Sequence, residues 1–198
     1  MEWYEQEVRA MEQRLRESPP AAEPVAFYGS SSMRMWDSLE DDFHDVGVKN
    51  IAFGGSTMEA CAWFFERLVV PCHPRSIVCY AGDNDLGDGR TPEEVLASFR
   101  KLLVKVDAHF PLIPFTILAI KPSPARWHLA DRIRFTNEGL FCEVRSRDNG
   151  HFIDIFSAML GNDGRPDDSL FLEDGLHVGF KGYRVWKRLL LDRSGEIF

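Results

Sequence analysis

The sequence predicts an α/β fold, a three-layer α/β/α sandwich around a five-stranded, doubly wound parallel sheet. Two observations lead to this prediction. Segments rich in β-branched and aromatic residues alternate with segments of helical period along most of the chain. Several of the first kind, such as IVCYA and FTILAI, are almost continuously apolar. Such runs are typical of parallel strands that are covered on both faces, whereas a half-exposed strand would alternate.

The expected strands and the helices that connect them follow from these two kinds of segment. The strands are Val25–Tyr28, Lys49–Phe53, Ser76–Ala81, Phe115–Ile120 and Phe152–Ile155. The helices are Glu2–Glu17, Met58–Val69, Thr91–Phe110, Leu129–Arg147 and Lys181–Asp192. The helix expected from Thr91 starts with TPEE, in which threonine caps, proline takes the first helical position and acids occupy the first turn.

The chain length predicts a single domain. The 198 residues are about the size of one domain, and no repeat or long linker divides them. A composition of 44% hydrophobic and 27% charged residues argues against disorder. We therefore expect one domain over residues 1–198, with residues 1–20 forming an amino-terminal helix that packs on it and ends at Pro19-Pro20.

Composition also limits the partners and the compartment. The formal net charge of −8 disfavours nucleic acid and membrane surfaces, because both are negatively charged. The amino terminus lacks the apolar region of a secretory signal, and no apolar run approaches the ~20 residues of a membrane span. Cys61, Cys72, Cys79 and Cys142 form no CxxC pair. We expect buried, reduced thiols and a cytoplasmic protein, although export without a leader stays open.

In doubly wound sheets the functional site lies at the carboxyl ends of the strands. The first expected strand runs into Gly29-Ser30-Ser31-Ser32, which would present a serine hydroxyl and free backbone N–H groups there. The second ends in Gly54-Gly55, where paired glycines let an N–H face a ligand. Taken alone, an N-cap serine and a tight turn explain these two features better.

Two further polar blocks add chemical groups to this edge. The third strand ends in GDND, whose Asn84 can aim its side-chain amide at a developing oxyanion. The run DNDLGDG departs from a calcium loop at Gly87 and Asp88, so we expect no calcium. Downstream, Asp174 and His177 in DGLH can supply a general base and the carboxylate that orients it, as ester hydrolysis requires. A DxxH pair alone is common by chance.

Together these blocks resemble the SGNH hydrolase superfamily of GDSL-like esterases and lipases, named for Ser, Gly, Asn and His in separate blocks. YGSSSMRMW resembles the first block, FGGST the second, GDND the third and DGLH the last, between about Val25 and Tyr183. The resemblance implies a flavodoxin-like arrangement of the sheet. One position departs from the pattern, because Ser30 stands where most members carry aspartate. The departure leaves open which of three adjacent serines attacks, and we favour Ser31, which aligns with the family serine and keeps Trp36 at the usual distance.

The resemblance implies a serine esterase that hydrolyses short-chain, first of all acetyl, carboxylic esters. Ser31 would be the nucleophile, His177 the general base and Asp174 its partner. The backbone N–H groups of Ser31 and Gly55 and the side-chain amide of Asn84 would form the oxyanion hole. Neither a metal nor an organic cofactor is implied, and the expected partner is a small-molecule ester. The sequence identifies no substrate-binding residue and leaves the oligomeric state open, with a homodimer compatible.

Three other interpretations stay open. The same family includes lysophospholipases and thioesterases. From another class, a non-catalytic α/β module could hold a phosphate or acidic ligand in the serine-rich turn, where a helix would begin. The DGLH block argues against this module, because an anion cradle has no use for an oriented neutral base. The third interpretation is a degenerate member of the family, retained for protein contacts.

Overall fold

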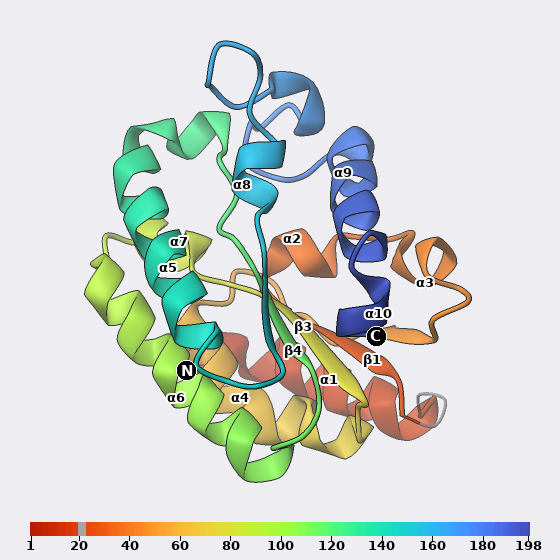
Figure 1. Ribbon diagram of the computed structural model, residues 1–198. Helices are drawn as coiled ribbons and strands as arrows, with labels where there is room; N and C mark the ends of the chain where they lie inside the picture. Colours follow the sequence, from red (N-terminus) through yellow and green to blue (C-terminus); the bar gives the residue numbers. More distant parts are fainter. Residues whose placement is uncertain (20–22) are drawn as a thin grey trace.

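Five parallel strands form one sheet in the computed structural model, which describes residues 1–19 and 23–198 (Figure 1). The strands are β1 (Val25–Gly29), β2 (Val48–Asn50), β3 (Ser76–Tyr80), β4 (Phe115–Leu118) and β5 (Gly150–Ile153). Their order across the sheet is β2-β1-β3-β4-β5, and each neighbouring pair is parallel. The chain therefore moves outward from β1 in both directions, which confirms the doubly wound sheet predicted from the sequence.

Helices cover both faces of this sheet and complete the three layers. One layer contains α1 (Glu5–Glu17), α4 (Met58–Leu68), α6 (Pro92–His109) and α7 (Ala130–Val144), which pack side by side. The other contains α2 (Ser31–Arg34), α3 (Leu39–Asp42), α9 (Phe180–Leu191) and α10 (Ser194–Ile197). Short helices lie in the connections, namely η1 (Glu2–Tyr4), η2 (Val70–Cys72), α5 (Asp83–Gly87), η3 (Pro124–Leu129), α8 (Ile155–Ala158) and η4 (Asp168–Leu170).

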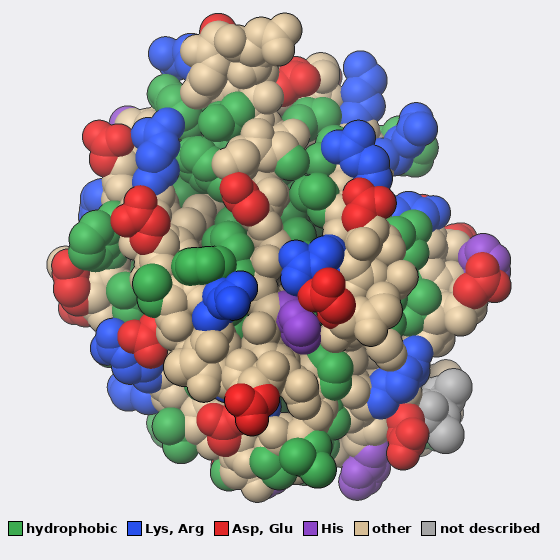
Figure 2. Space-filling view, in the orientation of Figure 1, with side chains coloured by type: hydrophobic (Ala, Val, Ile, Leu, Met, Phe, Trp, Pro, Cys, Tyr) green, Lys and Arg blue, Asp and Glu red, His purple; other side chains and the backbone are tan. Residues whose placement is uncertain are grey.

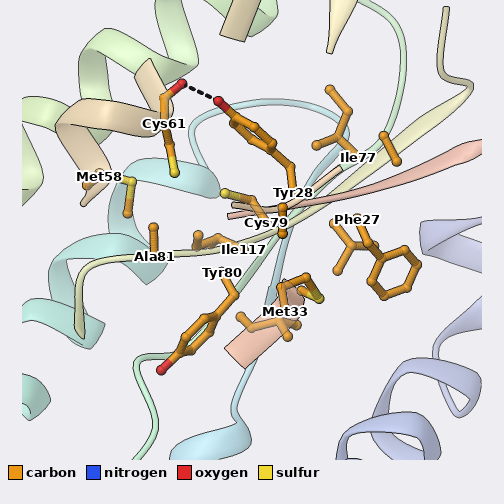
Figure 3. Close-up of a cluster of buried hydrophobic side chains, with 14 of the residues drawn as sticks. Phe27, Tyr28, Met33, Met58, Cys61, Ile77, Cys79, Tyr80, Ala81 and Ile117 are labelled. Atoms are coloured by element: carbon orange, nitrogen blue, oxygen red, sulfur yellow. Dashed lines mark hydrogen bonds between the residues drawn. The ribbon is translucent and has the colours of Figure 1, made fainter. Parts of the chain in front are cut away.

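Buried apolar side chains from both faces of β1 and β3 form the centre of the core. Every residue of these two strands is buried, as the continuous apolar runs predicted. Successive side chains point to opposite faces, so Tyr28 reaches toward α4 while Phe27 points away from it, on the side of Met33 (Figure 3). The hydroxyl of Tyr28 donates to the carbonyl of Cys61, 2.8 Å away, which satisfies a polar group inside this core.

Every expected strand has a different limit in the structure at one end or both, and the second and the last differ most. The second ends at Asn50 instead of Phe53, although the N–H groups of Ile51 and Phe53 still donate to backbone carbonyls of β1. The last begins and ends two residues earlier than predicted. It ends there because the Asp154 carboxylate accepts from the Ser157 N–H, 3.0 Å away, and so caps α8.

Two further predictions concern the start of α6 and the burial of the cysteines. The TPEE signature forms a complete capping box, in which Thr91 and Glu94 each accept a hydrogen bond from the other's backbone N–H. Three cysteines are buried as expected, but Cys142 is exposed, because it lies on the outer side of α7. The prediction of four buried thiols is therefore wrong at that position.

The amino-terminal helix packs against α4. Its buried face consists of Val8, Met11 and Leu15. On the rim, the guanidinium of Arg67 lies 2.8 Å from a carboxylate oxygen of Glu5 and 2.8 Å from one of Glu12. The helix ends at Glu17, and Pro20, the second half of the expected helix stop, falls outside the described residues.

The surface carries charges of both signs. Figure 2 shows acidic and basic side chains interspersed on one face, with hydrophobic side chains between them. Within residues 1–19 and 23–198, no helix has both the length and the apolar character that a membrane crossing requires.

Candidate active site

The turn after β1 places Ser31 at the first position of α2, at the carboxyl edge of the sheet. This turn requires glycine at Gly29, because its φ is +134° and a Cβ there would lie 1.9 Å from the carbonyl oxygen of Tyr80 in β3. The backbone N–H of Ser30 donates to the same carbonyl at 2.9 Å. Ser30 and Ser32 are each 2% exposed, whereas Ser31 is partly exposed. Ser31 is therefore the serine of this turn that solvent can reach.

Several backbone N–H groups at this edge have no acceptor in the part of the chain that the structure describes, and two of them are the donors expected for the oxyanion hole. They belong to Ser31 and Gly55. The first is free because it begins a helix, whose first turn has no intrahelical partners for its N–H groups. The second lies in a turn where Gly55 has a φ of +65°, a conformation that favours glycine. Both groups are available to an incoming oxygen atom.

Asn84 links the turn that contains Gly55 to the turn after β3. It lies in α5, and its side-chain Nδ2 donates to the backbone carbonyl of Ser56 at 3.1 Å. Its Oδ1 lies 3.3 Å from both terminal nitrogens of Arg126. Because a side-chain amide nitrogen carries two hydrogens, one N–H of Asn84 remains for a further acceptor.

A buried carboxylate joins the same two turns one residue later. Asp85 Oδ2 accepts a hydrogen bond from the backbone N–H of Met58, the first residue of α4, at 2.8 Å. Burial raises the pKa of Asp85 to about 6, against the lowering effects of the Met58 N–H and of Arg90. The Arg90 guanidinium is 4.0 Å from the other carboxylate oxygen. The ionised form of Asp85 therefore destabilises the folded protein.

This cost makes a testable prediction about stability. A folded-state pKa above the unfolded value means that the folded protein binds this proton more tightly, so Asp85 opposes folding above about pH 6 and ceases to do so as the pH falls toward 4. Asp85→Asn removes this effect. Its free energy of unfolding, relative to that of the wild type, should therefore be roughly 2–3 kcal/mol higher at pH 8 than at pH 4. Urea denaturation at both pH values measures it. A difference independent of pH would contradict the prediction.

The loop before α9 holds a carboxylate and an imidazole in contact. Asp174 Oδ2 lies 2.6 Å from His177 Nδ1. The other oxygen, Oδ1, accepts from the backbone N–H groups of Leu176 at 2.8 Å and His177 at 2.9 Å. These hydrogen bonds, that of the His177 side chain first, lower the pKa of Asp174 to about 2. The carboxylate is therefore ionised at neutral pH and can only accept.

Contacts between distant segments anchor this loop at the same edge. The carbonyl of Gly175 accepts from the N–H of Ala125 in η3 at 3.0 Å, and η3 also carries the Arg126 that contacts Asn84. The hydroxyl of Tyr183 in α9 donates to the carbonyl of Ser32 in α2 at 2.8 Å. The hydrogen bonds of the described residues do not include one between the Ser31 hydroxyl and the imidazole. Contacts of this kind are often formed only when substrate is bound.

The sequence of this chain matches a known protein family. The sequence profile of the GDSL-like Lipase/Acylhydrolase family matches residues 12–185, which contain all four blocks. The chain belongs to this family. It is therefore an enzyme of the GDSL-like acylhydrolase type, as the resemblance implied. No curated protein sequence matches the chain significantly.

Solved structures of low sequence identity share the fold of this GDSL-like protein. A Streptococcus pneumonia protein, assigned provisionally as a platelet activating factor, has a TM-score of 0.83 at 19% identity, covering 96% of this chain and 94% of that one. A GDSL-like lipase from Bacteroides thetaiotaomicron has a TM-score of 0.77 at 18% identity, covering 98% and 97%. An acetylxylan esterase from Geobacillus stearothermophilus, solved as a catalytic mutant, has a TM-score of 0.71 at 14% identity, covering 89% and 95%.

A buried charge cluster lies beside Asn84 in the GDSL-like protein, and it was not predicted from the sequence. The side chain of Lys121, 1% exposed, contacts the carboxylate of Asp83 and donates to the hydroxyl of Tyr80 at 3.2 Å. Arg126 lies 2.7 Å from the other oxygen of Asp83. Burial opposes ionisation of Asp83, but the two cations outweigh it and lower its pKa. Lys121 and Arg126 follow β4 at its carboxyl end, which was the one available signal.

Potential metal ligands do not gather in the described part of the chain. Across residues 1–19 and 23–198, no three His, Cys, Asp or Glu side chains are placed together so that they could hold a metal ion.

Proposed function

We propose that this protein is a serine esterase that hydrolyses short-chain, first of all acetyl, carboxylic esters through an acyl-enzyme. The proposal assigns Ser31 as nucleophile, His177 as general base and Asp174 as the carboxylate that orients the base. The observation that carries it is the contact of 2.6 Å between Asp174 and the ring of His177, in a loop of a GDSL-like acylhydrolase. The partial exposure of Ser31 between two buried serines supports its role as nucleophile.

The hydrogen bonds of Asp174 decide which ring nitrogen carries the proton. Since the ionised carboxylate can only accept, Nδ1 of His177 must carry the hydrogen of the 2.6 Å contact. In the neutral ring Nε2 then has a free lone pair. This nitrogen takes the proton of the Ser31 hydroxyl as the serine oxygen attacks the ester carbonyl carbon.

The free N–H groups at the sheet edge would stabilise the tetrahedral intermediate. Its oxyanion accepts hydrogen bonds from the backbone N–H groups of Ser31 and Gly55 and from the remaining N–H of Asn84. The intermediate collapses when the alcohol leaves with the proton held by His177, and the acyl group stays on Ser31. Water then attacks the carbonyl of the acyl-enzyme while the same imidazole takes its proton, and this proton passes to the Ser31 oxygen as the acid is released.

Removing the side-chain donor should reduce turnover strongly without abolishing it. We expect Asn84→Ala to lower kcat by about 10²–10³-fold, equivalent to roughly 3–4 kcal/mol of transition-state stabilisation, because two backbone donors remain. The measurement is steady-state hydrolysis of p-nitrophenyl acetate. Asn162→Ala, at an exposed position between α8 and η4, serves as the control. A wild-type rate in Asn84→Ala would exclude Asn84 from the oxyanion hole.

A fluorophosphonate probe tests the proposed function directly, because only an activated serine forms the covalent adduct. We expect peptide mapping to place the label on Ser31. An unlabelled protein that instead binds inorganic phosphate would favour the non-catalytic anion module.

The substrate class is tested separately with p-nitrophenyl esters of increasing acyl length, acetylated sugars, lysophospholipids and acyl thioesters. The similarity in fold to an acetylxylan esterase supports acetyl esters as the first choice. A preference for long acyl chains or thioesters would favour the lysophospholipase or thioesterase alternatives.

A further inference from the structure

Arg126 contacts the side-chain oxygen of Asn84, the candidate oxyanion donor. Both terminal nitrogens of its guanidinium lie 3.3 Å from Oδ1 of Asn84. A guanidinium has donors and no acceptor, so it can face only the oxygen of a side-chain amide. If Asn84 turned by half a rotation, its NH₂ group would point at the cation and the free N–H would be lost from the sheet edge. Arg126 therefore disfavours the flipped amide, together with the Ser56 carbonyl, which accepts from Nδ2 at 3.1 Å.

The surrounding residues hold this guanidinium in place. Arg126 lies 2.7 Å from Asp83 Oδ1, and Asp83 is held in turn by the buried Lys121. The flat side of the group rests on Gly87 of α5, where a Cβ would lie 2.7 Å from the Arg126 side chain. The Arg126 side chain is only 18% exposed. Its position is thus determined by an ion pair and by a glycine that leaves room for it.

The charge balance of the cluster adds an electrostatic effect. Two cations, Lys121 and Arg126, face the single carboxylate of Asp83. One positive charge next to the amide of Asn84 is therefore not balanced within the cluster. A positive charge at Oδ1 draws electron density from the amide, so Nδ2–H becomes a stronger donor toward a negative oxygen.

We propose that Arg126 is a positioning residue that orients and polarises the side-chain amide of Asn84 for the oxyanion. The assignment rests on the proposed esterase function, in which Asn84 supplies an oxyanion donor. Arg126 acts through Asn84 and need not touch the substrate. Its removal should therefore lower kcat and leave KM nearly unchanged.

A double-mutant cycle on p-nitrophenyl acetate tests this role. Arg126→Met should lower kcat by about 10–100-fold, and Arg126→Lys, which keeps the charge without the planar fork, should lower it less. In the Asn84→Ala background the same Arg126→Met change should cost less than about twofold, because the group it acts through is gone. An equal loss in both backgrounds, or a loss confined to KM, would overturn the proposal.

A matched control and a second readout separate this role from a loss of folding or of esterase function. Arg134→Met removes an arginine whose guanidinium lies over the Trp127 ring and does not contact Asn84, so it should keep the wild-type kcat. The side-chain amide signal of Asn84 in ¹H–¹⁵N spectra, assigned by its loss in Asn84→Ala, should shift in Arg126→Met and not in Arg134→Met. An unchanged signal in Arg126→Met would overturn the proposal even if the wild type hydrolysed none of the esters tested. If the wild type is inactive but the Asn84 signal still shifts in Arg126→Met, the esterase function is overturned while the orientation of the amide by Arg126 is supported.

Discussion

Ser31→Ala is expected to lower kcat for p-nitrophenyl acetate by on the order of 10⁴–10⁶-fold, because no acyl-enzyme can form without the hydroxyl. Some catalysis over water should survive, since the backbone N–H groups and Asn84 remain able to stabilise an oxyanion when water attacks directly. The fluorophosphonate label should also disappear. Folding should be little affected, because Ser31 is partly exposed and alanine is tolerated at the first position of a helix.

The neighbouring serines provide the matched controls. Ser30→Ala and Ser32→Ala remove hydroxyls from residues that are each 2% exposed, and both should retain kcat within about tenfold of the wild type. These controls matter because Ser30 occupies the position where the family pattern has aspartate. A variant of Ser30 or Ser32 that lost the label, with Ser31→Ala still active, would move the nucleophile to that position.

Asp174→Asn is expected to lower kcat by on the order of 10³–10⁴-fold, through the tautomer of His177. Asp174 Oδ1 accepts from two backbone N–H groups, so the oxygen of the asparagine must stay on that side. The NH₂ group then faces His177 Nδ1 in place of the carboxylate oxygen 2.6 Å away. Since an NH₂ group can only donate to the ring, the proton moves to Nε2, which can no longer accept a proton from Ser31.

A second aspartate of the same region controls for changes in loop structure. Asp167 accepts from the backbone N–H of Ser169 at 3.0 Å and contacts no imidazole, so Asp167→Asn should keep the wild-type kcat. The low pKa of Asp174, about 2, keeps its carboxylate ionised throughout an assay between pH 5 and 9, so a change in rate across that range does not arise from Asp174. Wild-type kcat in Asp174→Asn would mean that the carboxylate does not orient the base.

Most of the fold could be predicted from the sequence, because the signals for strands and helices are local. A continuous apolar run such as IVCYA requires burial on both faces, and the capping box at Thr91 and Glu94 depends on residues three positions apart. The ends of elements were less predictable. The last strand stops where Asp154 caps the next helix, and a sequence pattern of apolar residues continues past that point into Ile155.

The candidate site divides in the same way. The sequence by itself predicted Ser31, Asn84, Asp174 and His177 as the chemical groups of the candidate site, because each lies in a short block at the end of an element. The contact between Asp174 and His177 was also predictable from sequence, since three positions within one loop suffice for it.

Only the tertiary structure decided which serine of the turn is accessible and what holds the amide of Asn84. Arg126 is 42 residues from Asn84 along the chain, and their contact exists because β3 and β4 are neighbours whose following turns meet at one edge. No local pattern records such a contact, because it depends on the order of the strands and on the room left by Gly87. The free energy that sets it comes from packing and charge between distant segments, which appear only when the chain is folded.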